Sequence, residues 1–327
     1  MKAFRMNAFR AACVAALLAV PLFAAAQDAF PSKPLRIVVP YPPGGASDVT
    51  ARLLGQKMTE SWGQQVVIDN RPGANGILAL EHVAKQPADG YTLLLANLGP
   101  NAINPAIYSK LPYDPVKDFA PITLTTLVPQ VLVVAPAFEG RTLKELLDQA
   151  RANPGRLNYG NGGNGSSNHL GVELLAALAG VSFTSVPYKG DAQAMTDAMS
   201  GQVTMTFPTV VAATPHIRSG KLRALAVGTK ARVASIPDVP TMQEGGVPGY
   251  ESFSWGGIMA PAGTPGPVLN KLHGEFVRIL KLPEIQEKLA GLGATVSAMG
   301  PAEFAVFLQA EIRKWDGVAK RAGIRLE

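Results

Sequence analysis

One short stretch near the N-terminus joins three kinds of local structure, and it constrains the fold more than any other feature of the sequence. The apolar run Leu35–Val39 predicts a buried strand, and the prolines after it end the strand because proline donates no ladder hydrogen bond. Gly44 and Gly45 then allow a tight turn, and Ser47 or Asp48 can cap the helix that follows. Such a helix start leaves free N–H groups pointing outward, so the stretch predicts an anion-binding site.

The same design returns between Tyr159 and His169, where a short strand, a glycine-rich loop and a helix start follow one another. Ser166 or Ser167 can supply the N-cap, and serine hydroxyls with free N–H groups can take both oxygens of a carboxylate. The alternative interpretation is a flexible surface loop whose glycines only form a turn. Because the first unit has the same design, we favour two anion sites that close around one small carboxylate.

The glycines of this second loop also match other motifs. Gly160-x-Gly-x-x-Gly165 has the spacing of a dinucleotide fingerprint, but the strand before it is short. The acid after the next strand, Asp191, also comes later than that fingerprint requires. The loop has no lysine for a phosphate-binding loop, and no Gly-x-Ser-x-Gly elbow marks a serine nucleophile. We therefore expect no cofactor and no catalytic residue.

The N-terminus predicts export. Residues 1–26 contain three basic residues, an apolar run and then Ala24-Ala25-Ala26, which is typical of a secretory signal peptide cleaved near Ala26. The apolar run is too short to span a membrane. The single cysteine, Cys13, lies in this segment, so the mature chain is expected to have no disulfide and no thiolate metal site. We expect the mature protein in the periplasm.

Charge and histidine spacing exclude further classes. The formal net charge of +6 falls to +3 without residues 1–26, because that segment holds three basic residues and no acid. A modest positive balance suits small anions, whereas nucleic acid is not expected as a partner because the sequence has no basic block. The four histidines have no partner at metal-ligand spacing, so we expect no metal site.

The mature region alternates short β runs with helical patterns, which predicts an α/β fold. The extended segment 121–135 and the apolar run 222–227 can each carry the chain between two domains. We therefore expect two α/β lobes that hinge over a cleft and are joined by two crossing segments. The expected first domain is discontinuous, residues 27–127 with 228–327, and the second is 128–227.

The remaining elements follow from periodicity and turn residues. Further strands are expected at residues 65–69, 91–96, 157–159, 183–188, 203–207 and 255–260. Further helices are expected at residues 77–85, 142–152, 168–178, 192–200, 267–281 and 301–322. The segment Asn97–Asn104 predicts a polar loop at the carboxyl end of a strand, where ligands bind in open α/β sheets. Trp255 is expected in the core.

Five side chains keep two interpretations each. Asp48 and Asp191 are either helix caps or acceptors for a ligand amine or hydroxyl. Tyr41 and Tyr188 either pack in the core or line the cleft from strand ends, and we favour lining. His169 is either a packing histidine, which is the default, or a ligand contact.

Several short motifs occur in an order and spacing that resembles the extracytoplasmic solute receptors of the Bug type, the substrate-binding components of tripartite tricarboxylate transporters. The motifs are Val39-Pro-Tyr-Pro-Pro-Gly-Gly45 with Asp48, Asp69-Asn-Arg-Pro-Gly73, Asp89-Gly-Tyr-Thr-Leu93, Leu111-Pro-Tyr-Asp-Pro115 with Asp118-Phe119, Tyr159 to Leu170, Val186-Pro-Tyr-Lys-Gly190, Leu222-Arg-Ala-Leu-Ala226 and Ala260-Pro-Ala-Gly-Thr-Pro265. The resemblance covers nearly the whole mature length. It implies a two-lobed periplasmic-binding-protein fold, type II-like, that closes on a small carboxylate. It also implies that backbone N–H groups, hydroxyls and ordered waters hold the carboxylate, with no obligatory arginine.

Carried over to this sequence, the resemblance implies three ligand-binding loops and a fourth that lines the cleft. The expected ligand-binding residues are Tyr41, Pro43, Gly44, Gly45, Ala46, Ser47, Asp48, Asn97, Gly99, Asn101, Gly163, Ser166, Ser167, Asn168, His169, Tyr188, Gly190, Asp191 and Ala192. Members of the family vary in the loop around Asn97–Asn101, and Asn161–Asn164 is unusually rich in glycine and asparagine here. The ligand therefore stays open among mono-, di- and tricarboxylates, amino acids and aromatic acids.

We expect a monomeric periplasmic solute-binding protein, without catalysis, that captures a small organic carboxylate by closure of its lobes. Its expected partners are the inner-membrane subunits of a tripartite tricarboxylate-type transporter. One alternative is a receptor that presents the bound anion to a membrane sensor protein. A less favoured alternative is an exported hydrolase that uses Ser166 or Ser167 with His169. Adjacent positions at a helix start cannot easily provide a base that is bonded to the nucleophile and oriented by a third group.

Overall fold

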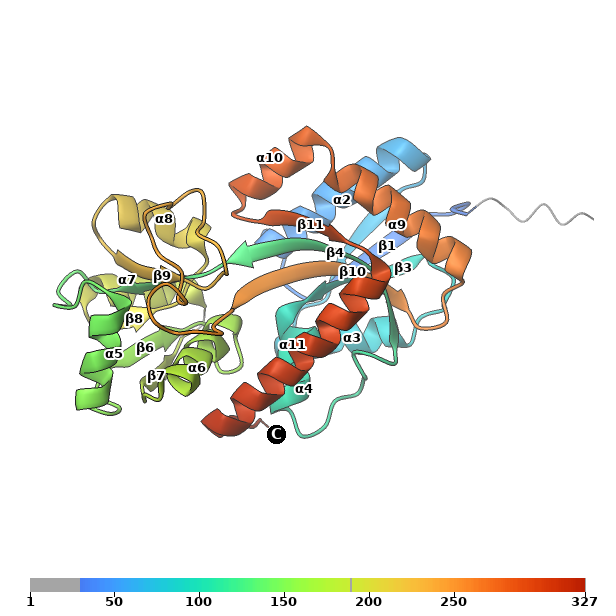
Figure 1. Cartoon of the computed structure of the whole chain (residues 1–327). Coiled ribbons are helices and arrows are strands. Elements are labelled where there is room, and N and C mark those ends of the chain that lie inside the picture. Colours follow the sequence, from blue (N-terminus) through green and yellow to red (C-terminus); the bar gives the residue numbers. More distant parts are fainter. Residues whose placement is uncertain (1–29, 189, 327) are drawn as a thin grey trace, which may run out of the picture. The chain divides into compact units, whose positions relative to one another are not determined.

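The fold is described from a computed structural model, whose described residues are 30–188 and 190–326 (Figure 1). Contacts divide the chain into two units, residues 1–32 and residues 33–327, and the second unit carries all features below. The predicted signal peptide, residues 1–26, lies outside the described residues. None of the described helices is both long enough and apolar enough to cross a membrane.

A six-stranded sheet organises the first half of this unit, with the strand order β11-β4-β10-β3-β1-β2. Its strands are β1 (Leu35–Val39), β2 (Val66–Asn70), β3 (Thr92–Asn97), β4 (Phe119–Pro129), β10 (Phe253–Pro261) and β11 (Thr295–Met299). β2 and β3 run parallel to β1, whereas β10 and β11 are antiparallel to their neighbours. The central strands are almost continuous apolar runs because helices cover both faces of the sheet.

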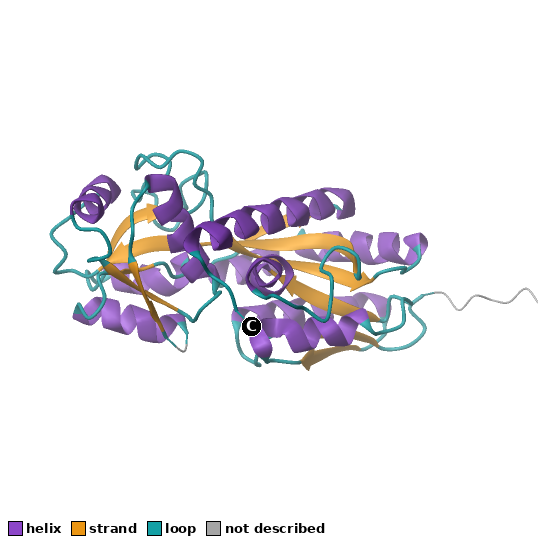
Figure 2. Cartoon of the chain, turned by 90° about the horizontal axis from the view of Figure 1, so that it is seen from below, coloured by secondary structure: helices purple, strands orange, loops and turns teal. Residues whose placement is uncertain are grey.

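The helices around this sheet form two layers, seen above and below the strands in Figure 1 and flanking them in Figure 2. α2 packs against α9 on one face, and α11 packs against β4 and α4 on the other. The helices are α2 (Ala46–Trp62), α3 (Ile77–Ala84), α4 (Asn104–Ile107), α9 (Gly266–Leu280), α10 (Pro283–Gly291) and α11 (Pro301–Ala322). Short helical turns at Ala74–Gly76 and Gly99–Ile103 precede α3 and α4.

A five-stranded sheet organises the other half, with the strand order β7-β6-β8-β5-β9. Its strands are β5 (Val131–Val134), β6 (Asn158–Asn161), β7 (Thr184–Pro187), β8 (Met205–Thr206) and β9 (Arg223–Val227). Its helices are α5 (Leu143–Ala152), α6 (Ser167–Ala179), α7 (Asp191–Ser200) and α8 (Val210–Arg218). Each of β6, β7 and β8 leads into a helix, which sets three helix starts side by side at one edge of this sheet.

The chain passes between the two sheets twice. It first passes at Gln130, which separates the end of β4 from the start of β5. It leaves β9 at Val227 and enters β10 at Phe253. The segment that follows β9 is bonded to the first crossing, because the N–H of Gly228 donates to the carbonyl of Gln130 at 2.9 Å.

The segment between β9 and β10 packs beside the five-stranded sheet. The N–H of Met242 donates to the carbonyl of Val227 (3.0 Å), and the hydroxyl of Tyr250 donates to the carbonyl of Gly171 in α6 (2.9 Å). The predicted domain boundary at residue 228 stays a prediction, and these contacts favour a boundary nearer to Phe253.

The predicted strands and helices are present within a few residues, but four elements were not predicted: α4, α8, α10 and β11. Pro215 inside α8 obscured the helical pattern there, whereas α10 has only nine residues and so shows little periodicity. The predicted polar loop after β3 is wrong, since that segment is helical. Its asparagines turn inward: Asn101 is fully buried, and its side-chain oxygen accepts a hydrogen bond from the N–H of Asn97 (3.0 Å).

Candidate ligand-binding site

A cavity of about 220 Å³ is lined by residues of both halves of the unit. Five predicted ligand-binding residues line it: Ala46, Ser47, Asn97, Ser167 and Asp191. Six polar or aromatic residues that were not predicted as ligand contacts also line it: Thr50, Thr125, Thr126, Thr209, Ser254 and Trp255. The volume is below the roughly 300–1,000 Å³ of pockets for drug-sized ligands, so the cavity suits a small metabolite.

Four helices begin at this cavity. Ala46 and Ser47 open α2, Ser167 opens α6, Asp191 opens α7 and Thr209 is the N-cap of α8. The starts of α2, α7 and α8 have no side-chain cap, so their first N–H groups keep their hydrogen-bonding capacity. Each helix start carries about half a positive charge from the helix dipole. The arrangement therefore favours an anion without any basic side chain.

Two serines at these helix starts are held by amide side chains. Asn97 donates through Nδ2 to Oγ of Ser47 at 3.4 Å, and Gln130 donates through Nε2 to Oγ of Ser167 at 3.3 Å. A serine oxygen that accepts a hydrogen bond keeps its own proton free to donate. Both hydroxyls thus keep a proton to donate, and the two serines line the cavity from different halves of the unit.

Asp48 braces the turn that leads into α2. Its carboxylate accepts hydrogen bonds from the N–H of Gly44, from Nε of Arg52 and from Nδ2 of Asn70, each at 2.9 Å. Burial raises the pKa of Asp48, but these hydrogen bonds outweigh burial and hold the pKa below its usual value. Neither predicted cap, Ser47 or Asp48, is the N-cap, since α2 begins after Gly45. Of its two predicted roles, Asp48 does not cap the helix but secures the turn before it, and its role as a ligand acceptor stays a prediction.

Ser166 and His169 secure the second loop from inside. Oγ of Ser166 accepts from the N–H of His169, which confirms Ser166 as the N-cap of α6. Nδ1 of His169 accepts from the N–H of Gly165 (3.1 Å), and the ring stacks on Tyr159 with centroids 6.1 Å apart. Burial lowers the pKa of His169 to about 4, so the ring is neutral at pH 7.

Asn168 links this loop to the start of α7. Its Nδ2 donates to Oδ1 of Asp191 at 2.6 Å, and its Oδ1 accepts from the N–H of Gly162 at 3.2 Å. Asp191 therefore faces the cavity with one oxygen already bonded. Tyr188, in contrast, donates to Oδ2 of Asp197 (2.7 Å), on the side of α7 that packs against β6 and β8.

The other predicted residues do not line this cavity, and their role as ligand contacts stays a prediction. They are Tyr41, Pro43, Gly44, Gly45, Asp48, Gly99, Asn101, Gly163, Ser166, Asn168, His169, Tyr188, Gly190 and Ala192. The sequence held one signal for the cavity-lining residues that were not predicted. Thr125 and Thr126 interrupt the apolar run of β4, and two adjacent polar side chains in a buried strand indicate a site they could line. Trp255 is buried as predicted and also forms part of the cavity wall.

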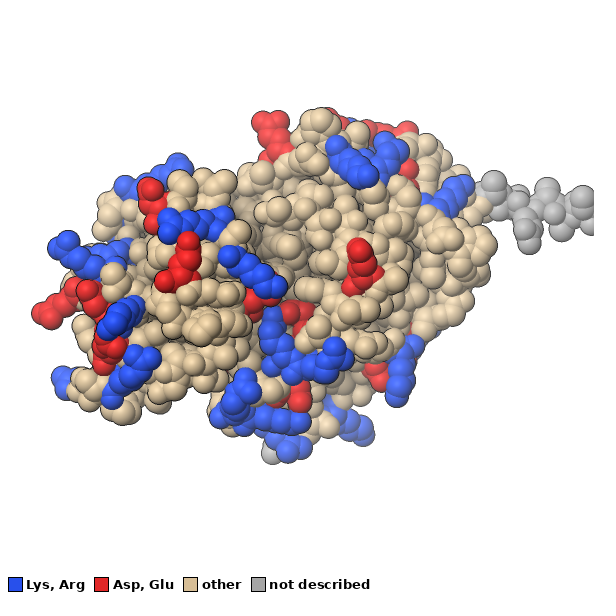
Figure 3. Space-filling model, in the orientation of Figure 1, with Lys and Arg blue, Asp and Glu red and all other residues tan. Residues whose placement is uncertain are grey.

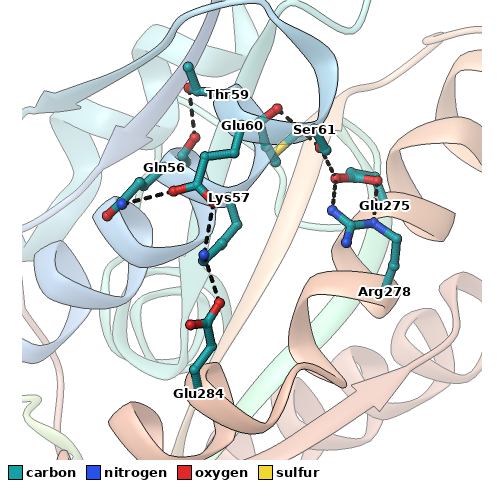
Figure 4. Close-up of polar contacts among 10 residues, drawn as sticks. Gln56, Lys57, Thr59, Glu60, Ser61, Glu275, Arg278 and Glu284 are labelled. Carbon is teal, nitrogen blue, oxygen red and sulfur yellow. Dashed lines mark hydrogen bonds and ion pairs between the residues drawn. The ribbon is translucent and has the colours of Figure 1, made fainter.

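The helices beside the turn that links α10 to β11 are tied to α2 (Figure 4). Lys57 of α2 pairs with Glu284 of α10 at 2.6 Å, and Glu275 of α9 accepts a hydrogen bond from the last turn of α2. The turn after α10 places Leu292 and Ala294 on the cavity. The ion pair and the hydrogen bond thus connect the helix that presents Ala46 and Ser47 to the helices beside the cavity.

Charge in and around the cavity is unevenly distributed. No lysine or arginine of residues 30–188 and 190–326 lines it, and Asp191 is the one ionisable side chain of that described part that does. On the face in Figure 3, basic and acidic side chains are interspersed. No group of three or more histidine, cysteine, aspartate or glutamate side chains within the described residues could hold a metal ion.

A larger cavity, of about 1030 Å³, lies beside α5 and β9 but is a weaker candidate. Two of its three basic side chains are already bonded: Arg223 donates to the carbonyls of Phe138 and Gly140 at 3.0 Å, and Lys144 pairs with Asp148 at 2.5 Å. It is also lined by the second half of the unit alone, whereas the smaller cavity draws on both halves.

Comparison with known proteins identifies relatives over nearly the whole chain. Residues 50–324 match the family model described as the tripartite tricarboxylate transporter family receptor. The chain is 36% identical to BugT of Bordetella pertussis over 301 residues, which cover 92% of each protein.

Two solved structures share both fold and sequence with the chain. One is Rpa4515 of R. palustris with adipate, with a TM-score of 0.79 and 38% identity over 90% of this chain and 99% of that one. The other is the periplasmic binding protein BugD, with a TM-score of 0.75 and 34% identity over 91% of this chain and all of that one.

Proposed function

Because the chain belongs to the tripartite tricarboxylate transporter receptor family, we propose that its 220 Å³ cavity is the site where this solute-binding protein captures a small organic carboxylate. The observation that carries the proposal is the convergence of four helix starts on a cavity with no described basic lining residue. Helix dipoles and free N–H groups favour a carboxylate there.

In the proposed complex, the carboxylate accepts hydrogen bonds from first-turn N–H groups and from the hydroxyls of Ser47 and Ser167. Because these serines come from opposite halves of the unit, one ligand can hold the two halves together. Closure removes water from the site and strengthens each charge-assisted bond. An affinity near 1 µM needs about 8 kcal/mol, which several such bonds and the buried ligand surface can supply.

We further propose that the chain is exported by its N-terminal segment and delivers the carboxylate to the membrane subunits of a tripartite transporter. Support comes from the family model and from the likeness to a periplasmic binding protein. Catalysis is not proposed, because the family consists of receptors. In the described residues, the Ser166 hydroxyl and the His169 ring also bond to separate backbone groups.

The test replaces the two serines separately. Refolded, ligand-stripped protein is titrated calorimetrically with succinate, glutarate, adipate, and their hydroxy and amino derivatives. At least one acid should bind with one-to-one stoichiometry, and Ser47→Ala and Ser167→Ala should each weaken it about tenfold or more, because each removes a hydrogen bond to a charged group.

The matched control is Ser219→Ala, at the exposed end of α8, which should bind like the unmodified protein. If no acid of the panel binds, the proposed function is wrong. If both serine variants bind as tightly as the control, the cavity is not the site.

A further inference from the structure

The cavity holds a buried hydrogen-bond acceptor that a carboxylate cannot satisfy. Asn97 donates through Nδ2 to the carbonyl of Trp255 (3.3 Å) and to Ser47. Because the carbonyl of Trp255 can only accept, the side-chain amide of Asn97 cannot be flipped to exchange its nitrogen and oxygen. Its Oδ1 is consequently fixed as an acceptor, and it is buried without a partner among the described residues.

A second unpartnered group lies beside it. β4 bulges opposite Gly256, so that Thr125 is an extra residue in the pairing and its Oγ1 is buried without a described partner. Gly256 keeps this recess open, because a Cβ there would lie 3.0 Å from Oγ1 of Thr126 and 3.4 Å from Oγ1 of Thr125. Bulges often re-aim side chains next to binding sites.

A second acceptor faces the cavity from the other half of the unit. Asp191 receives one hydrogen bond, from Asn168, and makes no ion pair among the described residues. Lys189 lies outside those residues. Burial raises the pKa of Asp191, and the bond from Asn168 offsets this only in part. A ligand carboxylate beside this side chain is repelled when Asp191 is ionised, unless a donor group of the ligand lies between them.

These acceptors lie close to the proposed carboxylate position. Asn97 is bonded directly to Ser47, and Asp191 is bonded to the residue that follows Ser167. A donor attached near the carboxylate is therefore well placed to reach them.

We propose that the natural ligand carries a hydrogen-bond donor, a hydroxyl or an ammonium group, on the carbon next to its carboxylate. This inference rests on the proposed function and narrows its ligand from carboxylates in general to 2-hydroxy or 2-amino acids. A ligand without the donor leaves buried acceptors unpaired, which corresponds to roughly a tenfold to hundredfold loss of affinity.

The experiment uses matched acids that differ only at the carbon next to the carboxylate. Refolded, ligand-stripped protein is titrated with three sets: propionate, lactate and alanine; succinate, malate and aspartate; glutarate, 2-hydroxyglutarate and glutamate. Within the set that binds best, the hydroxy or the amino acid should bind at least tenfold more tightly than the unsubstituted acid.

Asp191→Asn separates the two donors. If the ligand is an amino acid, this variant should lose tenfold or more affinity, because the ammonium loses its counter-charge. If the ligand is a hydroxy acid, the amide oxygen can still accept and the loss should stay within a few-fold. The control, Asp148→Asn, removes an equally charged but exposed side chain on α5. It should leave the affinities for the hydroxy acid and for the amino acid unchanged.

Equal affinity for the substituted and unsubstituted acids of the best set overturns this inference and leaves the proposed function standing. If none of the nine acids, nor adipate, binds, the proposed function fails and this inference fails with it.

Discussion

At the scale of single residues, the site relies on hydroxyl, amide and backbone N–H groups instead of charged donors. Ser47 and Ser167 each lie in the first turn of a helix, one in each half, and each accepts a hydrogen bond from the side-chain amide of another residue. Charged and ring-bearing side chains mostly secure the loops: Asp48 holds the turn before α2, and His169 holds the loop before α6.

His169 makes the stability of the protein depend on pH. The folded protein keeps the ring neutral down to about pH 4, whereas the usual histidine pKa of 6.5 applies in the unfolded chain. Between these values the unfolded state binds more protons, so the free energy of unfolding falls as the pH falls. The total loss is about 3 kcal/mol and is complete below pH 4.

Urea unfolding at several pH values measures this contribution. His169→Gln keeps an acceptor for the N–H of Gly165 but cannot titrate, so its stability should fall less than that of the unmodified protein between pH 6.5 and 4. His216→Gln, on α8, retains His169 and should keep the original pH dependence. Superimposable profiles for His169→Gln and the unmodified protein would refute this role.

At the scale of elements, the turn before α2 depends on two glycines for different reasons. Gly44 adopts φ +87°, a conformation that side chains disfavour, and its N–H donates to Asp48. Gly45 has an ordinary φ of −76°, and a Cβ there would meet only the carbonyl oxygen of Pro42, at a normal contact distance of 3.9 Å. Gly44 is thus required by the backbone, whereas Gly45 can accept a small side chain.

Alanine at each position tests this difference. Gly44→Ala should lower the free energy of unfolding by about 1 kcal/mol because of the left-handed backbone, and should weaken carboxylate binding by displacing the start of α2. Gly45→Ala should leave stability within about 0.5 kcal/mol and affinity within about twofold. Urea unfolding and calorimetry provide both readouts. Equal effects of the two substitutions would show that φ at residue 44 does not govern the turn.

At the scale of the whole unit, glycines also set how the two halves meet. A side-chain carbon at Gly165 would collide with Ile107, and one at Gly293 would lie 2.5 Å from Cβ of Val211. In each pair one residue belongs to the six-stranded half and the other to the five-stranded half. The described arrangement therefore brings the halves into direct contact at two places, one of them next to Ala294 on the cavity.

The sequence allowed prediction of the strand–turn–helix units because their signals are local. An apolar run, glycines and a capping residue lie within about fifteen positions, and Ser47, Ser167 and Asp191 follow from them. Thr125 and Thr209 could not be predicted in this way. Thr125 reaches the cavity through a β-bulge set by its pairing with β10, and Thr209 reaches it through the start of α8, a helix whose internal proline hides its pattern. Both depend on contacts between distant segments.

The most direct test of the central claim is a crystal structure of the protein with the acid that binds most tightly in the titrations. We expect a carboxylate oxygen about 2.7–3.2 Å from a first-turn N–H of α2 or α6 and from the hydroxyl of Ser47 or Ser167. A ligand found in the larger cavity beside α5, or a carboxylate held by lysine or arginine side chains away from these helix starts, would contradict the account.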